Sequence, residues 1–209
     1  MTGVQTCALP IYAEYITVNQ NSNVIEMPKN ATFEEAAAII FGGQTAIYFL
    51  DKAKIAEKVN PKVLIVGATG SVGTAAIQIA RHHKADITAV CSSEGRKLVS
   101  ALGVNSIVLY DKEDFTKQSE KFDIIFDAVG KFNKKQCEIL LNKNGIYKSV
   151  SSVSASETIQ QLKLLKKLFE KEELKAIIDK TFTMTEIVEA HRYVDTERKK
   201  GNVVLKMCE

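Results

Sequence analysis

The stretch VLIVGATGSVGTAAIQIA, from Val63 to Ala80, sets three glycines between two apolar segments. Its first four residues are apolar and mostly β-branched, which is typical of a buried strand. Gly67, Gly70 and Gly73 follow, and an alanine-rich apolar run then favours a helix. The short glycine segment between the two predicts a tight strand-to-helix turn.

This glycine loop has the form of a phosphate-binding turn. Gly70 has no Cβ, so a bound pyrophosphate can approach its backbone, and Gly73 lets the helix pack closely against the strand. The N–H groups at the helix N-terminus, helped by the helix dipole, would accept the negative phosphates. The pattern therefore favours dinucleotide binding. A purely structural turn, or a site for another nucleotide-like ligand, fits the same glycines.

Short β-branched runs alternate with helical patterns beyond Pro61. Expected strands lie at Val63–Val66, Ile87–Val90, Ile107–Leu109, Ile124–Phe126, Ile146–Val150 and Ala176–Ile178. Expected helices lie at Val72–His83, Gly95–Leu102, Asn133–Leu141 and Glu157–Lys171, and the gap at Glu113–Ser119 has no clear pattern. Such alternation indicates βαβ units around a parallel sheet. We therefore expect an α/β fold, a Rossmann-type doubly wound parallel sheet of about six strands.

Two helices are expected before the first of these strands. Thr32 and Glu35 have the spacing of a capping box and predict a helix start. Gly42 and Gly43 are expected to end that helix, because glycine is a poor helix former. A second helix is expected over 45–55.

Composition indicates an ordinary globular protein. Of the 209 residues, 45% are apolar and 25% are charged, which suits a chain that buries a large core without disulfides. The net charge is +3 and the lysines are scattered, so no nucleic-acid partner is expected. No apolar run approaches the length of about 18 residues that spans a membrane, so no membrane partner is expected either.

The cysteines predict neither a metal site nor a disulfide framework. They are far apart and include no CxxC pair. We therefore expect no zinc, and we interpret the cysteine usage as that of a reducing, cytoplasmic location. The four residues are Cys7, Cys91, Cys137 and Cys208.

The segment AVCSSEGRK, at the end of the second expected strand, bears on the choice of cofactor. Enzymes that prefer NAD usually carry an acidic residue about 20 positions past the glycine loop, whereas Ser92 or Ser93 fills that position here. Together with Arg96, these hydroxyls suit a ribose 2′-phosphate, which a carboxylate would repel. We therefore expect NADP(H). The alternative is that Arg96 is a solvated helix residue, and Glu94 can serve the dipole at the helix start.

Five stretches carry a resemblance to a known family. They are FGGQTAIYFL, VLIVGATGSVGTAAIQIA, ITAVCSSEGRKLVSALGVNSIVLYDKEDF, FDIIFDAVGK and GNVVL, in order and at family spacing. From about Ala13 to Met207 the chain resembles the medium-chain dehydrogenase/reductase superfamily, and GATGSVG most resembles its zinc-independent quinone oxidoreductase branch. The resemblance implies hydride transfer from a nicotinamide cofactor to a quinone or an α,β-unsaturated carbonyl, and a homodimer for the intact protein.

The resemblance also implies cofactor-binding residues. These are Thr45 near the nicotinamide; Gly70, Ser71, Val72 and Gly73 at the pyrophosphate; Ser92, Ser93 and Arg96 at the 2′-phosphate; Tyr110 near the adenosine half; and Ala128 and Val129 beside the cofactor. Asn202 stands where many relatives have lysine, which leaves its cofactor contact open. No catalytic acid or base is expected within the chain, and Asp127 is expected to orient local backbone.

The resemblance divides the chain into unequal parts. Residues 1–11 resemble a translated sequencing adapter and are set apart from the fold. Residues 12–30, with a candidate strand at Ala13–Val18, would be the end of a truncated GroES-like catalytic domain, a partly open β-barrel. Residues 31–180 would form the dinucleotide-binding domain, and residues 181–209 a helix and a strand that return to the catalytic domain. Without most of that domain, the chain is expected to be inactive.

Two other functions fit the same residues. A zinc-type alcohol dehydrogenase of the same superfamily would carry its metal ligands outside this chain, although the Ala-Thr-Gly loop argues against it. A nucleotide-binding module without catalysis would bind the cofactor and turn over no substrate.

Overall fold

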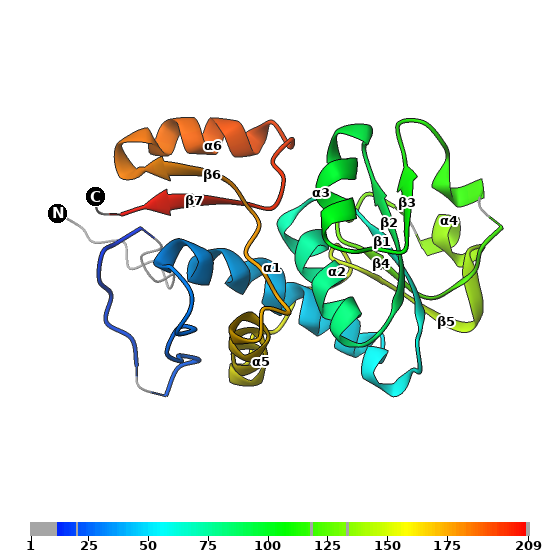
Figure 1. Ribbon diagram of the computed structural model, residues 1–209, viewed down its shortest axis with the longest axis horizontal. Coiled ribbons are helices and arrows are strands. Elements are labelled where there is room, and N and C mark those ends of the chain that lie inside the picture. The colour runs from blue at the N-terminus through cyan, green and yellow to red at the C-terminus, as the bar shows by residue number, and fades with distance from the viewer. Residues whose placement is uncertain (1–11, 20, 118, 133, 208–209) are drawn as a thin grey trace.

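The computed structural model describes residues 12–19, 21–117, 119–132 and 134–207 (Figure 1). Its strands are β1 (Lys62–Val66), β2 (Asp86–Cys91), β3 (Ser106–Leu109), β4 (Phe122–Asp127), β5 (Leu141–Ser149), β6 (Ile178–Thr183) and β7 (Asn202–Lys206). Its α-helices are α1 (Phe33–Lys52), α2 (Ser71–His82), α3 (Arg96–Ala101), α4 (Lys134–Glu138), α5 (Ile159–Glu170) and α6 (Ile187–Asp195). Short 3-10 turns are η1 (Ile55–Glu57), η2 (Ser93–Gly95), η3 (Phe115–Lys117) and η4 (Met184–Glu186).

A parallel sheet of five strands, in the order β3-β2-β1-β4-β5, lies among helices on the right-hand side of Figure 1. Val63 of β1 pairs with Ile87 of β2 on one side and with Ile124 of β4 on the other. The chain winds outward from β1 in both directions, so the expected Rossmann-type doubly wound sheet is confirmed. In such sheets, ligands bind at the carboxyl ends of the strands, where the winding direction reverses. Here that point lies between β1 and β4.

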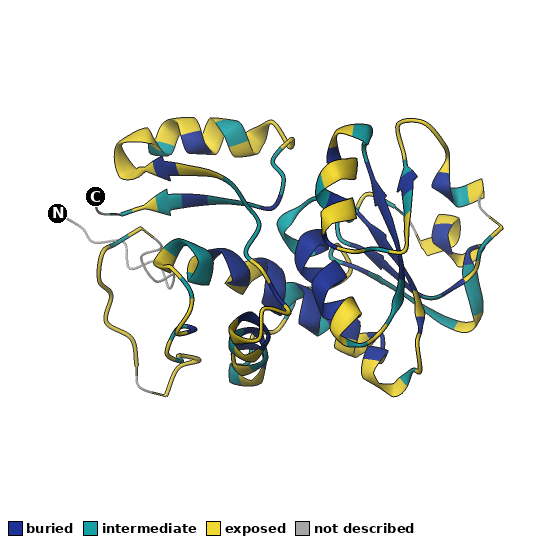
Figure 2. Ribbon diagram, in the orientation of Figure 1, coloured by how far each residue is buried: buried dark blue, intermediate teal, exposed yellow. Residues whose placement is uncertain are grey.

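Both faces of the sheet are buried, because its strands are apolar on both sides. In β1, Val63 and Ile65 pack into a core with α1, α2, α3 and α5, while Leu64 and Val66 pack with η3 and α4 on the other face. Figure 2 shows the buried residues gathered on the strands and on the helix faces turned toward them. Within the described residues, no helix is both long and apolar enough to cross a membrane.

The sixth expected strand, Ala176–Ile178, does not join this sheet. The chain instead forms β6, which pairs in parallel with β7 in a separate two-stranded sheet. The central sheet thus has five strands, not about six. In β6 only Phe182 is buried, so this strand lacks the apolar residues that both faces of a covered sheet require. The expected boundary between residues 180 and 181 falls within β6.

The expectation that Gly42 and Gly43 end a helix is wrong, since α1 runs through both without a break. Both glycines are buried where another helix packs closely. A Cβ on Gly42 would lie 2.5 Å from the carbonyl oxygen of Ser71, and one on Gly43 would lie 2.5 Å from a methyl carbon of Leu165. Close packing against α2 and α5 therefore outweighs the low helix propensity of glycine.

The elements expected near the C-terminus are confirmed, whereas the strand expected near the N-terminus is wrong. Thr32 and Glu35 do form the capping box that begins α1, and α6 and β7 confirm the helix and strand expected near the C-terminus. The candidate strand Ala13–Val18 is wrong, because residues 12–19 form no strand and Tyr15 is 92% exposed. An extended segment becomes a strand only beside a partner that takes its backbone hydrogen bonds, and no described strand pairs with it.

Candidate functional site

The glycine loop connects β1 to α2 at the point where the sheet reverses direction. Gly67 adopts a φ of 77°, a conformation that favours glycine, and an added Cβ would collide with the side chain of Val129. A Cβ on Gly73 would collide with the carbonyl oxygen of Gly67, so Gly73 allows the close packing of helix and strand expected from the sequence. A Cβ on Gly70 would meet nothing nearer than 3.7 Å, so this glycine borders open space.

The N-terminus of α2 points from this loop toward the carboxyl ends of the strands. Its N-cap residue, Gly70, has no side chain to cap the helix, so the N–H groups of the first turn have no side-chain acceptor there. The Thr74 hydroxyl donates backward to the Gly70 carbonyl at 2.9 Å and so leaves these donors free. Uncapped donors at the positive end of a helix dipole suit a phosphate group.

A cleft of about 530 Å³ opens beside this helix end. The residues expected from the sequence that line it are Thr45, Gly70, Ser71, Val72 and Ala128. The residues that the sequence did not single out are Phe41, Phe49, Val150, Val153, Ser154, Ala155, Glu157 and Lys199. The structure therefore brings part of α1, the glycine loop, the turn after β4 and the segment after β5 together around one cavity.

Asp127 holds the turn after β4 in shape. Its carboxylate is fully buried, and Oδ1 accepts hydrogen bonds from the backbone N–H groups of Val129 at 3.0 Å and Gly130 at 2.9 Å. Oδ2 accepts from the N–H of Phe132 at 3.2 Å. The expectation that Asp127 orients local backbone is confirmed. Its bonds fix the turn that places Ala128 in the cleft and Val129 against the glycine loop.

Tyr147 on β5 supports this buried carboxylate from the neighbouring strand. Its hydroxyl lies 3.4 Å from Oδ2 of Asp127 and donates to the carbonyl of Phe132 at 2.8 Å. Burial raises the pKa of Tyr147 to about 12, so the hydroxyl keeps its proton at neutral pH. Ser149 adds a further donor to Oδ2 at 3.3 Å. The turn thus rests on two adjacent strands.

The residues expected at a 2′-phosphate lie at the ends of β2 and β3, outside the lining of this cleft. Ser93 donates its backbone N–H to Asp111 Oδ1 at 2.8 Å, and Tyr110 is 58% exposed. Arg96 is exposed at the start of α3. Hydrogen bonding by Ser93 holds the pKa of Asp111 below its usual range, so a carboxylate stands beside the serines. The sequence analysis did not single out Asp111, although it follows an expected strand closely.

The segment before β7 lies against the glycine loop. The backbone N–H of Gly201 donates to the carbonyl of Thr69 at 2.6 Å, and Gly70 and Gly201 form an isolated parallel bridge. Asn202, the next residue, turns away from the cleft: its side-chain amide donates to the carbonyl of Ile177 at 3.1 Å. The chain end thus reaches the loop through Gly201.

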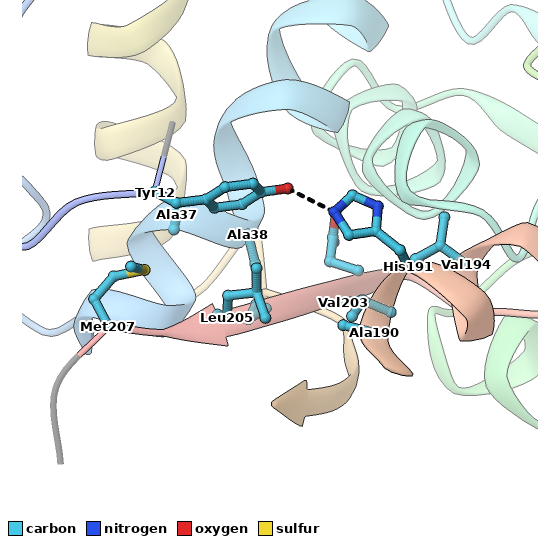
Figure 3. A pocket seen from close by; sticks show the side chains of 11 residues that line it. Tyr12, Ala37, Ala38, Ala190, His191, Val194, Val203, Leu205 and Met207 are labelled. Carbon is cyan, nitrogen blue, oxygen red and sulfur yellow. Dashed lines mark hydrogen bonds between the residues drawn. The ribbon is translucent and has the colours of Figure 1, made fainter. Parts of the chain in front are cut away.

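Asn202 instead lines a second groove, of about 370 Å³, between α1, α6 and β7. In Figure 3, the Tyr12 hydroxyl points across this groove to His191 Nε2, at 3.2 Å. Most other lining residues are apolar, including Val203 and Leu205 of β7. This groove is therefore lined mainly by apolar side chains, and no helix N-terminus comparable to that of α2 is among the described residues that line it.

The described residues contain no group of three or more His, Cys, Asp or Glu side chains that could hold a metal ion. Cys91 and Cys137 are buried free thiols. Burial raises the pKa of both, that of Cys137 to about 11, which disfavours the thiolate that binds zinc. Cys7 and Cys208, like the adapter-like residues 1–11, lie outside the described residues.

A family comparison agrees with this geometry. Residues 71–178, just over half of the chain, match the family described as zinc-binding dehydrogenase. The chain belongs to this family. It is therefore a member of the medium-chain dehydrogenase/reductase superfamily, as the resemblance of the glycine loop and the later motifs implied.

Two curated relatives of the chain are named as a reductase and an oxidoreductase. The chain is 30% identical over 204 residues to the 2-methylene-furan-3-one reductase of Solanum lycopersicum, covering 92% of this chain and 52% of the relative. It is 26% identical to the chloroplastic NADPH-dependent alkenal/one oxidoreductase of Arabidopsis thaliana, with the same coverage. The chain thus spans about half the length of these curated relatives.

A solved structure of the same fold is the quinone oxidoreductase from Coxiella burnetii. The TM-score is 0.74 at 25% identity, over 87% of this chain and 63% of that chain. The likeness covers most of the chain, which agrees with the expected Rossmann-type dehydrogenase fold.

Proposed function

We propose that this chain is the cofactor-binding part of an NADPH-dependent oxidoreductase that reduces quinones or α,β-unsaturated carbonyls by hydride transfer. The observation that carries the proposal is the uncapped N-terminus of α2, which opens with Gly70 into the 530 Å³ cleft. The reductases among its relatives support the reaction class. Because the chain spans about half the length of the curated relatives, substrate and turnover are proposed for the whole protein.

The residues of the cleft fit a dinucleotide. The N–H groups of the first turn of α2, among them that of Val72, would bind its pyrophosphate, and the open space at Gly70 admits the phosphate close to the backbone. Thr45, which lines the same cleft, would lie at the nicotinamide end, as the family resemblance implies. The cofactor supplies the hydride when bound. The chain's own residues bind and orient it, and the buried Phe49 gives the cleft an apolar wall.

The cofactor type is proposed from the residues at the ends of β2 and β3. Arg96 is exposed and forms no ion pair with the described residues, so its guanidinium is free for a 2′-phosphate beside Ser92 and Ser93. Asp111 opposes this choice, because its carboxylate repels the same phosphate. We propose that Arg96 prevails and that NADPH is preferred, as in the alkenal/one oxidoreductase named above.

The proposal includes a zinc-independent reaction, a homodimer for the intact protein and a cytoplasmic location. The GATGSVG loop supports the zinc-independent branch over the zinc-type alcohol dehydrogenases. The buried free thiols Cys91 and Cys137 suit a reducing compartment. Metal analysis after purification without chelators tests the first point, since about one zinc per chain would assign the protein to the alternative.

Binding and turnover test the proposal separately. NADPH binding to this chain is measured by calorimetry, and NADPH oxidation is followed with a small quinone and with an enone. We expect measurable binding with turnover near background, beside robust turnover by the Solanum lycopersicum reductase as a parallel control. Failure to bind either NADPH or NADH contradicts the proposal. Turnover by this chain equal to that of the control contradicts the expectation that much of the substrate pocket lies elsewhere.

A further inference from the structure

Lys199 extends from the turn between α6 and β7 into the cleft beside the glycine loop. It lines the same cavity as Gly70 and Ser71. Its Nζ donates to the carbonyl oxygen of Gly201 at 2.8 Å, and Gly201 is itself bonded to the loop through Thr69. The ammonium group is therefore anchored on Gly201, the residue whose backbone bridges to Gly70.

The charge of Lys199 has no carboxylate partner. Among the described residues no acidic side chain forms an ion pair with it. Asp179 on β6 influences the charge of Lys199, but its Oδ2 already accepts hydrogen bonds from the hydroxyl of Tyr193 at 2.6 Å and from the N–H of Lys200 at 2.9 Å. A part-buried cation without a partner is costly, and an anion in the same cavity would relieve that cost.

We propose that the Lys199 ammonium binds the pyrophosphate of the dinucleotide at the glycine loop, from the side opposite the N-terminus of α2. The inference rests on the proposed function. Helix N–H groups contact one side of the phosphates, and a lysine adds a full point charge that the neutral loop lacks. Glu157, which lines the same cavity with the opposite charge, makes this positive charge more necessary. Lys199 enters the site from a segment more than a hundred residues after the loop.

Proton uptake is a second consequence. Burial lowers the pKa of Lys199, and Asp179 only partly opposes this shift. A bound pyrophosphate would raise the pKa again, because it favours the charged amine. Cofactor binding should therefore take up protons in the alkaline range and should weaken as the pH rises through the pKa of Lys199. Asp179 favours the charged amine, and Glu157 is the acidic side chain that lines the same cavity.

The test compares Lys199→Met with Lys199→Arg and with Lys200→Met in the full chain. Lys200 is the adjacent lysine, but it does not line the cleft, so Lys200→Met is the matched control. We expect Lys199→Met to lower the binding affinity for both NADPH and NADH by about 10- to 100-fold, the range that the loss of a charge-assisted hydrogen bond covers. Lys199→Arg should retain most of the affinity, and Lys200→Met should leave it within twofold of the original, as a rough bound.

Three outcomes overturn the inference. Unchanged binding of both cofactors by Lys199→Met removes Lys199 from the site. A loss confined to NADPH assigns it to the 2′-phosphate instead of the pyrophosphate, and an equal loss in Lys200→Met indicates a general effect of net charge. If the unaltered chain binds neither cofactor, the proposed function itself is wrong, and this result is distinguishable from the three outcomes above.

A measurement on the unaltered chain does not depend on how the variants fold. Calorimetry of NADH binding in two buffers of different ionisation enthalpy, repeated from pH 7 to pH 10, reports the protons taken up. NADH is used because it lacks the 2′-phosphate, which titrates on its own. Uptake that grows above neutral pH supports the inference, and its absence across the whole range overturns it.

Discussion

Gly42 of α1 lies directly against Ser71 of α2: a Cβ added to Gly42 would stand 2.5 Å from the Ser71 carbonyl oxygen. Ser71 is also the first helical residue after the glycine loop. The contact between these two residues therefore sets how closely α1 approaches the glycine loop. Because α1 carries Thr45 and Phe41, the same contact sets the width of the cleft.

Substitution of Gly42 by alanine is expected to destabilise the fold. The methyl group would meet backbone, which cannot rotate away, and overpacking of this kind costs about 1–3 kcal/mol. The better helix propensity of alanine returns about 1 kcal/mol. Urea denaturation should thus show a net loss, and NADPH should bind more weakly because Ser71 is displaced. A variant as stable as the original would mean that α1 and α2 separate without cost.

Substitution of Gly70 by alanine is expected to lower NADPH affinity without lowering the stability of the fold. Its φ of −73° is allowed for alanine, and the added Cβ would meet only the Gly67 oxygen, at 3.7 Å. Stability should remain close to that of the original chain. NADPH affinity should fall by at least about tenfold, since the methyl group occupies the approach of the phosphate. Undiminished affinity measured by calorimetry would place the pyrophosphate elsewhere.

Replacement of Asp127 by asparagine removes one acceptor oxygen from a fully buried side chain whose hydrogen bonds to the turn are part-buried. Oδ1 and Oδ2 together serve three backbone N–H groups, and leaving buried donors without an acceptor costs about 1–3 kcal/mol. We expect that loss of unfolding free energy, together with weaker NADPH binding as Ala128 loses its fixed place. Tyr147→Phe, which keeps the carboxylate, should lose less. The interpretation fails if the two variants are equally stable.

Replacement of Arg96 by glutamine tests the proposed 2′-phosphate contact. NADPH binding should weaken by about 1–3 kcal/mol, the value of a lost charge-assisted contact, while NADH binding should remain nearly unchanged. Calorimetry with both cofactors measures the two losses. Equal losses would show that Arg96 does not read the 2′-phosphate.

Replacement of Asp111 by asparagine tests the opposing charge. The bond from the Ser93 N–H can pass to the amide oxygen, while the repulsion of a 2′-phosphate disappears. The ratio of NADPH to NADH affinity should therefore rise severalfold. A ratio that stays constant would place the 2′-phosphate beyond the influence of Asp111.

The pH dependence of stability should include a contribution from His83 at the end of α2. Burial, with the neighbouring His82, lowers its pKa in the folded chain below the ordinary value of 6.5, while Asp51 opposes the shift. The unfolded chain therefore binds this proton first, and folding loses stability as the pH falls through about 6.5. Replacement by glutamine should reduce the loss between pH 7.5 and pH 5.5 in urea denaturation. An unchanged loss would assign it to other groups.

The sequence predicted correctly those elements whose structure depends on residues that are close together in the chain. The four apolar residues of β1, the glycines that follow and the capping box at Thr32 and Glu35 are contiguous or closely spaced, so their structure could be read directly. Gly42 and Gly43 were misread because their partners, Ser71 and Leu165, lie far away in the chain. A glycine that ends a helix and a glycine that allows another helix to pack closely look the same in the local sequence.

The site was predicted in part for the same reason. Thr45 and Ala128 belong to motifs with recognisable spacing, and the structure places both in the cleft. Glu157 and Lys199 have no local signal, because the long return of the chain after β5 carries them there. Asp111 was visible as an acid after an expected strand, but its proximity to Ser93 follows from strand pairing.

The long helix α1 has a consequence for how the molecule denatures. It contacts α2, α5 and β5 on the side of the large sheet, and β7 on the side of the small one (Figure 1). If either sheet unfolds, α1 loses contacts, and the remaining sheet is then packed against a less stable helix. The free energies of unfolding of the two sheets are therefore coupled. The chain should therefore unfold in a single cooperative transition, with the same midpoint whether followed at the buried aromatic residues of the large sheet or at Tyr193 beside the small one.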